Sequence, residues 1–386
     1  MMVEALVSPE VLRWARVRAD LSLAMLAEKL QLQPDKVAAW ESGEMRPTFR
    51  QAEKVATILH VPFGYLFLDE PPEERLPLPD LRTRDAAQPD HLGADALDLL
   101  RDVLRQHDWY REYLLDQGAE PLPFVGQFGA DASVDEVAAD IRRRLDMDAD
   151  DAAAGDFEQR FSQLCDRCEE IGVWVMRAGV VAGNPHRPLS TDDFQGFAIA
   201  DPVAPLVFVN GRDAKAAQIF TLAHELAHIW LGSSGISHSN LGDQPIGIRE
   251  NERRCNAIAA EVLAPRCTLL ALWRKNADLE WNVEALSRRF KVSRIVIARA
   301  AADAGLISWG VYKFFFEQEI RFWNSRTKIS GGNFYLTAPV RNGKRFTNAV
   351  VNSAMSGALL LRDAGGLLHM KPATVRKLYQ RNISER

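Results

Sequence analysis

The stretch FTLAHELAHIWLG, residues 220–232, contains two histidines four positions apart and a glutamate directly after the first of them. On a helix, His224 and His228 lie one above the other on the same face, so both imidazoles can reach one metal ion. Glu225 is then placed to take a proton from a water molecule and to pass it to a leaving amine. Chance alone gives this pattern in about one chain in a hundred of this length, so it favours a zinc hydrolase site over a buried helix with two hydrogen-bonded histidines.

A catalytic zinc ion needs a third protein ligand, and the sequence excludes one arrangement for it. A metzincin-type site needs glycine at 231 and histidine at 234, where this chain has Leu231 and Ser234. In the arrangement with a glutamate ligand, the carboxylate comes from a later helix, and Glu252 stands twenty-four positions after His228. One turn further, Asn256 is placed to orient a ligand histidine.

Other side chains compete with Glu252 for the place of the third ligand. Glu250 points about 200° away from Glu252 on a helix, and Glu261 lies off the face that Glu252 occupies. His238, in the loop between the two helices, is the main rival or an oxyanion-binding group, and its alternative is a plain surface histidine. Imidazole and carboxylate ligands accept both Zn²⁺ and Mn²⁺, so the sequence predicts a zinc site and leaves manganese open.

The composition of the 386-residue chain is that of an ordinary globular protein, with 47% hydrophobic and 26% charged residues. This length allows two or three domains with cores of their own. No apolar run approaches the ~20 residues that span a bilayer, and the N-terminus lacks the pattern of a signal peptide. Four cysteines do not indicate a disulfide framework in so long a chain. We therefore expect a cytoplasmic protein with reduced thiols and no membrane partner.

Charge is distributed unevenly along the chain, although its net value is only −5. Residues 1–68 hold eight basic and eight acidic side chains, whereas residues 307–386 hold thirteen basic and four acidic ones, a net of +9. The part between them, residues 69–306, carries −14. Attraction of an anionic partner is therefore expected at the C-terminal end.

Composition and hydrophobic periodicity divide the chain into five parts. The first part reads as a set of short helices, beginning with the serine cap and first-turn proline of SPEVLRWARVRA. A proline-rich, charged segment follows and is typical of a linker, and the next part is acidic and helical. We predict the boundaries 1–68, 69–90 (linker), 91–171 (helical acidic connecting region), 172–306 (central domain) and 307–386 (basic, mainly helical region).

The central domain combines short strands with long helices. GVWVMRAG, FQGFAIAD and PLVFVNG predict three strands, and a loop is expected at 233–247. DAKAAQIFTLAHELAHIWLG is apolar on nearly every face, which indicates a buried helix. We expect the second or third strand to offer an exposed edge to an extended substrate. The fold class that follows is α+β, with an all-α first domain, a small sheet beside the HExxH helix, and a mainly helical C-terminal region.

The central domain resembles the ImmA/IrrE family of metallopeptidases over about residues 170–300. Two segments carry the resemblance, VNGRDAKAAQIFTLAHELAHIWLG and the later ENERRCNAIAAEVLAP. The resemblance implies a zincin-like fold for the central domain. It also implies zinc-dependent cleavage of a specific regulatory protein, typically a helix-turn-helix repressor, in a bacterial stress, mobile-element or toxin–antitoxin context. The chain departs from the family at Cys255, where alanine is common, and this small change leaves the implied site intact.

The first domain resembles the XRE (lambda-repressor-like) helix-turn-helix, and WESGEMRPTFRQAEKVA is its most specific piece. In this resemblance SLAMLAEKL is the first helix of the motif and PDKVAAWESG the recognition helix. Gln33, Asp35 and Lys36 would face base edges. Arg46 and Arg50 would meet phosphates.

A helical module for dimerisation or partner binding is the alternative to DNA binding. Residues 1–68 are electrically neutral, which weakens the attraction to phosphate, and Leu23 stands where such modules often carry a phosphate-contacting glutamine. Modules of this type usually work as dimers on paired half-sites, so a homodimer is compatible with the sequence.

The basic C-terminal region ends in LLLRDAGGLLHMKPATVRKLYQRN, which reads as two helices around a Met-Lys-Pro turn. It is compatible with a second helix-turn-helix, with Lys371, Arg376, Lys377 and Arg381 on the later helix, or with a solvated basic helix. Its partner would be nucleic acid, an acidic protein, or the acidic middle of the same chain.

Two hypotheses of function follow from these observations. In the first, the chain is a cytoplasmic bacterial regulator with its own zinc endopeptidase, in which His224, His228 and Glu252 hold the metal and Glu225 acts as general base and acid. In the second, it is an antitoxin-like regulator that binds operator DNA and a partner toxin, and the metal site serves structure or regulation.

Overall fold

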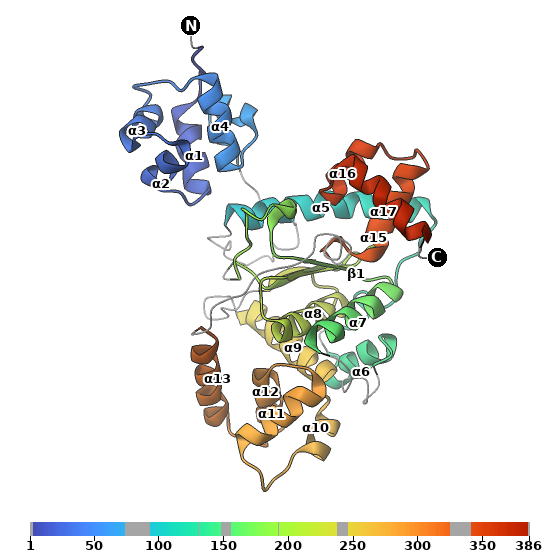
Figure 1. Cartoon of the computed structure of the whole chain (residues 1–386). Helices are drawn as coiled ribbons and strands as arrows, with labels where there is room; N and C mark the ends of the chain where they lie inside the picture. Colours follow the sequence, from blue (N-terminus) through green and yellow to red (C-terminus); the bar gives the residue numbers. More distant parts are fainter. Residues whose placement is uncertain are drawn as a thin grey trace. The chain divides into compact units, whose positions relative to one another are not determined.

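The computed structural model of the chain describes residues 3–73, 93–129, 131–147, 156–191, 193–237, 246–324 and 341–384 (Figure 1). The chain divides into two compact units, residues 1–77 with 89–101, and residues 78–88 with 102–386. Most of the linker expected at 69–90, from residue 74 onward, lies outside the described residues. The expected α+β class is confirmed, because a small sheet in the second unit stands among many helices.

The first unit begins with an all-α domain, and capping residues in the sequence mark the starts of its helices. Its elements are α1 (Pro9–Arg18), α2 (Leu23–Leu30), α3 (Pro34–Ser42), α4 (Phe49–Leu59) and the 3-10 helix η1 (Phe63–Phe67). The side chains of Ser8, Ser22 and Thr48 each accept a hydrogen bond from the first turn of the helix that they precede. Buried apolar side chains from all five elements, including Trp40 and Leu66, form one core, so the set of short helices folds as predicted.

The second unit contains a sheet of four strands, β1 (Trp174–Ala178), β2 (Gly196–Ile199), β3 (Leu206–Asn210) and β4 (Gly235–Ser237). Their order is β1-β3-β2-β4, with β1 parallel to β3 and the other pairs antiparallel. The three predicted strands are confirmed. β4 lies inside the segment 233–247 that was expected to be a loop. The expectation that the second or third strand offers an exposed edge is wrong, because β3 and β2 are both paired on two sides.

Helices cover both faces of this sheet. On one face lie α6 (Val134–Arg144), α7 (Phe157–Glu170), α8 (Lys215–Trp230) and α9 (Ile246–Leu263), whose buried side chains share a core with Val175 and Val207. On the other face lie α15 (Lys344–Met355) and, from helix α5 (Ala94–Asp116), the residues from 102 onward that belong to this unit. There the ring of Trp174 stacks on Phe346 at 4.4 Å. The sheet is therefore the middle layer of three.

The predicted boundary at residues 171 and 172 falls within one hydrophobic core. Ile141 of α6 and Phe161 of α7 belong to the same buried cluster as Leu222 of α8. Both helices begin with a capping box, Ser133 with Glu136 and Asp156 with Gln159. The segment predicted to be a connecting region thus contributes two helices to the layer that holds the HExxH helix.

The remaining helices complete the second unit. They are η4 (Val181–Gly183), α10 (Arg266–Leu272), α11 (Leu279–Phe290), α12 (Arg294–Asp303), α13 (Trp309–Asn324), α16 (Leu361–Leu368) and α17 (Pro372–Ser384). In the described part of the chain no single helix has the length and apolar character to cross a bilayer. One bent pair, Glu250–Leu263 with Arg266–Leu272, passes that test by length and composition only.

Candidate metal centre

Helix α8 carries the two histidines in the interior of the second unit. It packs against β2 and β3 on one side and against α6, α7 and α9 on others. Most of its apolar residues are therefore buried, as the sequence predicted. This packing also buries three polar side chains, His224, Glu225 and His228. Burying polar groups costs free energy unless they find partners, and helix α9 supplies these.

The carboxylate of Glu252, on α9, contacts both histidines. One of its carboxylate oxygens lies 3.2 Å from Nε2 of His224, and the other lies 3.3 Å from Nε2 of His228. The two Nε2 atoms are 3.1 Å apart. Three ligand atoms thus lie within 4.8 Å of one another, although the first and the last of their residues, His224 and Glu252, are 28 positions apart in the sequence. The structure therefore brings together the three side chains that the sequence nominated as ligands.

The competing carboxylates lie elsewhere. Glu250 is exposed, and the carboxylate of Glu261 accepts two hydrogen bonds from the backbone nitrogen of Arg266, both at 3.0 Å. His238 lies outside the described residues. Among the described residues, Glu252 is the carboxylate that reaches both imidazoles.

Each histidine is oriented through its second ring nitrogen. Nδ1 of His224 lies 3.1 Å from Oδ1 of Asn256, and Nδ1 of His228 lies 3.0 Å from Oγ of Ser233. Asn251 also donates from its amide to that hydroxyl, at 3.4 Å. When Nδ1 carries the proton, the lone pair of Nε2 faces the other donors, which is the form of histidine that binds a metal.

Ser233 was missed by sequence reasoning, although a local signal exists. Gly232 ends α8 with a positive φ of 67°, and the chain turns back so that the backbone nitrogen of Ser233 donates to the carbonyl of His228 at 2.9 Å. A hydroxyl residue directly after a helix-ending glycine therefore falls beside the last histidine of the motif.

The donor set fits a zinc ion. With metal–ligand distances of roughly 2.0–2.1 Å and tetrahedral angles, neighbouring ligand atoms stand about 3.3 Å apart. The two Nε2 atoms are 3.1 Å apart, and they lie 3.2 and 3.3 Å from the two oxygens of Glu252, one oxygen each, which is close to this spacing. Two imidazole nitrogens and one carboxylate suit zinc, and manganese accepts them as well.

Electrostatics in this cluster favours a charged Glu252. Burial alone raises the pKa of Glu252, but hydrogen bonds from His224 and His228 outweigh it and hold the pKa of the carboxyl well below its usual range. Burial lowers the pKa of His224, but the hydrogen bond with Glu252 and the nearby charge of Glu225 reverse this and raise it. The carboxylate is therefore ionised, as a metal ligand must be.

Glu225 lies against strand β2. At the point of contact, the strand has a position that only glycine can occupy. A Cβ atom on Gly196 would lie 3.0 Å from Oε1 of Glu225, 2.8 Å from the carbonyl oxygen of Phe208 and 2.5 Å from Cγ2 of Thr221. The missing side chain lets the strand backbone approach the buried carboxylate. The distance between this strand and α8 thus sets the space around Glu225.

Asn210 ties the segments around the centre together. Its amide nitrogen donates to the carbonyls of Ser190 and Phe194, both at 3.1 Å, and its Oδ1 accepts from the backbone of Arg212 at 3.1 Å. These bonds join the segment that enters β2 to the segment that enters α8. Asn210 is fully buried at the end of β3, and its hydrogen bonds therefore fix Gly196 relative to the HExxH helix.

Comparison with protein families agrees with this geometry. Residues 168–301 match the peptidase family described as the IrrE N-terminal-like domain. Residues 12–66 match the helix-turn-helix family, so the resemblance to an ImmA/IrrE metallopeptidase with an N-terminal helix-turn-helix is confirmed. Residues 342–381 match a domain of unknown function (DUF8813). No curated protein sequence matches the chain.

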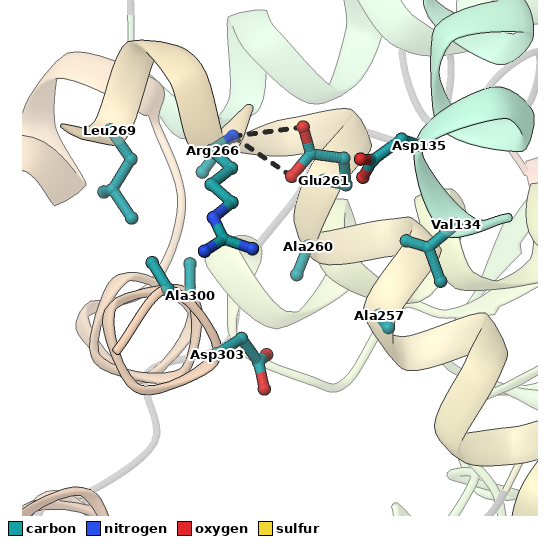
Figure 2. A pocket seen from close by; sticks show the side chains of 11 residues that line it. Val134, Asp135, Ala257, Ala260, Glu261, Arg266, Leu269, Ala300 and Asp303 are labelled. Carbon is teal, nitrogen blue, oxygen red and sulfur yellow. Dashed lines mark hydrogen bonds between the residues drawn. The ribbon is translucent and has the colours of Figure 1, made fainter. Parts of the chain in front are cut away.

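A small pocket lies between α9 and the helices α6, α10 and α12 (Figure 2). Ala257, Ala260 and Glu261 of α9 line it together with residues of α6, α10 and α12. Its volume is about 190 Å³, below the roughly 300 Å³ at which ligand pockets begin. Glu261 belongs to this pocket and not to the metal cluster.

The N-terminal helix-turn-helix has the predicted DNA contacts at its surface. Gln33, at the start of α3, and Asp35 are exposed, and Lys36 is half-buried. Arg46, between α3 and α4, and Arg50, in the first turn of α4, are exposed. All five are accessible, while their roles in DNA binding stay predictions.

Proposed function

We propose that the chain is a zinc-dependent regulatory endopeptidase joined to a DNA-binding module, and that it works in the cytoplasm. The observation that carries the proposal is the buried convergence of His224, His228 and Glu252 beside Glu225. The pairing of a helix-turn-helix with a peptidase-family domain supports a DNA-binding, protease-like regulator. Free thiols at all four cysteines agree with a reducing compartment.

In this proposal His224, His228 and Glu252 hold the metal. When bound, zinc polarises the scissile carbonyl and makes a water molecule more acidic. Asn256 and Ser233 contact the two Nδ1 atoms and so hold the imidazoles with Nε2 directed inward. Glu225 takes a proton from the attacking water and passes it to the leaving amine. Its burial against Gly196 keeps bulk water from competing for that proton.

The proposed substrate is a specific regulatory protein of the repressor type, in a bacterial stress, mobile-element or toxin–antitoxin context. Strand β4 supports an extended binding mode, because it is the sheet's edge strand beside β2 in the described part of the chain. A Cβ on Gly235 of this strand would lie 3.8 Å from Cε1 of His228. An extended peptide paired with β4 would thus pass close to the metal ligands.

An antitoxin-like regulator, which binds operator DNA and a partner toxin, is the second candidate. It is favoured by the burial of the cluster, since His224, His228 and Glu252 are only 4%, 2% and 7% exposed. A cluster so shielded from solvent could hold a metal that joins two packed helices. In this reading the metal stabilises α8 against α9 and turnover is absent.

The test compares cells that express the wild-type chain with cells that express Glu225→Gln, by mass spectrometry of co-purifying proteins. The endopeptidase proposal expects one protein that is intact with the variant and cut with the wild type. A partner that co-purifies uncut and equally with both supports the antitoxin-like reading. The matched control, Glu250→Gln, changes an exposed carboxylate and should behave as the wild type. Metal content should be equal in all three proteins.

A further inference from the structure

The N-terminal helix-turn-helix gives a template that can be compared with the rest of the chain. Gln31 adopts a left-handed conformation with φ 60° after α2, and Pro34 begins α3 three residues later. The backbone nitrogen of Leu32 donates to the carbonyl of Ala27 at 2.9 Å. The side chains that pack into the domain core at this motif are Leu26, Leu30, Leu32, Val37 and Trp40.

Helices α16 and α17 repeat this template at identical spacing. His369 adopts the left-handed conformation with φ 51° after α16, and Pro372 begins α17 three residues later. The backbone nitrogen of Met370 donates to the carbonyl of Gly365 at 2.9 Å. The buried side chains at the corresponding positions are Ala364, Leu368, Met370, Val375 and Leu378.

Gly365 occupies the position of Ala27, and its small size is required by the turn. A Cβ atom there would lie 2.6 Å from the carbonyl oxygen of Met370. A small residue at this position is what allows the first helix to contact the turn so closely. Ala27 carries a Cβ at the equivalent position, so the turn after α16 approaches its first helix more closely than the turn after α2 does. The left-handed residue and the backbone hydrogen bond are the local geometry that the two motifs share.

The same template occurs a third time, in α11 and α12, but there the second helix is covered. Lys291 has φ 54° and the backbone nitrogen of Val292 donates to the carbonyl of Ser287 at 3.2 Å. Helix α12 packs against α9, α10 and α13. Ala298 and Ala302 on it are buried, and Arg299 pairs with Asp303. Both cations of α12, Arg294 and Arg299, pair with carboxylates, so this helix does not offer them to phosphate.

Helix α17 has an exposed and basic outer face. From residue 371 to 381 the chain has four basic side chains and no acidic one, whereas from 33 to 43 it has one basic and two acidic ones. Lys371, Arg376 and Lys377 are exposed. In the described part of the chain none of these three has an ion-pair partner. In α3, by contrast, Glu41 is bound by Arg16 at 2.7 Å.

The acidic part of the second unit holds α15 and the turn but leaves α17 uncovered. The carboxylate of Glu169 accepts from the backbone nitrogens of Lys344 and Arg345 at 2.8 and 3.0 Å. Asp102 of α5 contacts His369 at the turn. Folding back on acidic residues thus accounts for the start of α15. In the described part of the chain it involves none of Lys371, Arg376 and Lys377.

We propose that residues 342–384 form a second helix-turn-helix and that α17 binds duplex DNA. The second helix of this motif enters the major groove through its N-terminal and outward-facing residues, and Lys371, Arg376 and Lys377 stand at such positions. Their charge matches the phosphate backbone, which supplies most of the non-specific affinity. Duplex RNA fits less well, because its major groove is too deep and narrow for a helix to read. This assignment does not depend on the metal centre.

The test is a fluorescence-anisotropy titration of the full chain against a labelled DNA duplex of mixed sequence, about three helical turns long. Arg376→Ala/Lys377→Ala should weaken binding about tenfold and reduce the salt dependence of log K by about two. The matched control Lys313→Ala/Arg321→Ala removes the same charge from the exposed surface of α13 and should leave affinity unchanged. Arg376→Lys/Lys377→Arg keeps the charge and should keep non-specific binding.

Four results would overturn the assignment. The first is no binding by the wild-type chain at low salt. The second is a loss of affinity that the α13 control shares. The third is a loss caused by Lys36→Ala/Arg50→Ala in the N-terminal motif with none caused by the α17 variant. The fourth is tighter binding of an RNA duplex of the same sequence than of DNA. Equal melting temperatures and metal contents of the variants show that folding is intact.

Discussion

The imidazole of His224 is held at Nδ1 by the side-chain oxygen of Asn256, 3.1 Å away. Asn256 and Glu252 lie one turn apart on the same face of α9, so one helix both offers a carboxylate and orients an imidazole. Because Nδ1 is engaged, Nε2 is the nitrogen that faces Glu252. The position of α9 therefore determines the geometry of two of the three candidate ligands.

Replacing Asn256 by alanine should weaken metal binding without unfolding the chain. The change removes the group that fixes the ring of His224, and losses of about 10- to 100-fold in metal affinity are typical when such a partner is removed. Competition with a chromophoric chelator measures the affinity directly. Asn352→Ala, at an exposed position on α15, is the control and should bind metal as the wild type does. Unchanged affinity in Asn256→Ala would mean that the contact does not orient the ligand.

Ser233 should have the corresponding role for His228. Ser233→Ala removes the hydroxyl that lies 3.0 Å from Nδ1 of that ring, so a loss of affinity in the same range is expected. Ser233→Thr keeps a hydroxyl and should retain most of the affinity. The same chelator titration checks both variants. Equal weakening by alanine and threonine would show that packing at this half-buried site, and not the hydroxyl, is what matters.

The candidate ligands could be predicted because they depend on local rules. His224 and His228 follow from helical periodicity alone. Glu252 and Asn256 follow from the periodicity of a second helix together with the family's spacing. Their mutual placement on α9 needed no knowledge of the rest of the fold.

The surroundings of the site could not be predicted, because they depend on contacts distant in sequence. The interior positions of β2 and β3 follow from strand order, which hydrophobic pattern does not encode. Gly196 reads in the sequence as one more strand residue, and its closeness to Glu225 appears only once β2 lies beside α8. The amphipathic pattern of α6 and α7 predicted two helices and gave no indication of what they pack against.

Gly196→Ala should impair the chemistry more than the metal site. The new methyl group would meet Thr221, Glu225 and the carbonyl of Phe208 at 2.5 to 3.0 Å, and the backbone oxygen cannot move without disturbing the sheet. We expect destabilisation of about 1–3 kcal/mol and displacement of the Glu225 carboxylate.

The measurements for this variant are metal content, the urea midpoint and cleavage of the partner protein once it is identified. Near-normal metal content with lost cleavage is the expected result. Gly366→Ala is the matched control, since a Cβ at Gly366 meets no atom within 4 Å. Full cleavage by Gly196→Ala would contradict the assignment of Glu225 to a confined position.

Asp140 anchors the C-terminal end of α8, so the stability of this end of the helix should depend on pH. Oδ2 of Asp140 accepts from the indole nitrogen of Trp230 at 2.8 Å and from Nε of Arg144 at 2.9 Å. Burial raises the pKa of Asp140, but these hydrogen bonds and the charges of the two neighbouring arginines outweigh it and lower the pKa. In the folded chain this pKa lies below the ordinary value of about 3.9. The ionised carboxylate therefore stabilises the folded state above that pH, and this stabilisation is lost as the pH falls through the folded-state pKa.

Asp140→Asn should therefore lower stability most at neutral pH. Loss of a charged acceptor for buried donors costs about 1–3 kcal/mol, and the difference from the wild type should shrink as the pH falls from about 5 to about 3. Hydrogen exchange of the α8 amides, followed at several pH values, reports on this end of the helix without requiring that the whole chain unfold in one step. Asp116→Asn, at the exposed end of α5, is the control. A difference that stays constant between pH 7 and pH 3 would show that the charge of Asp140 is not what holds Trp230, and shape alone would then account for the contact.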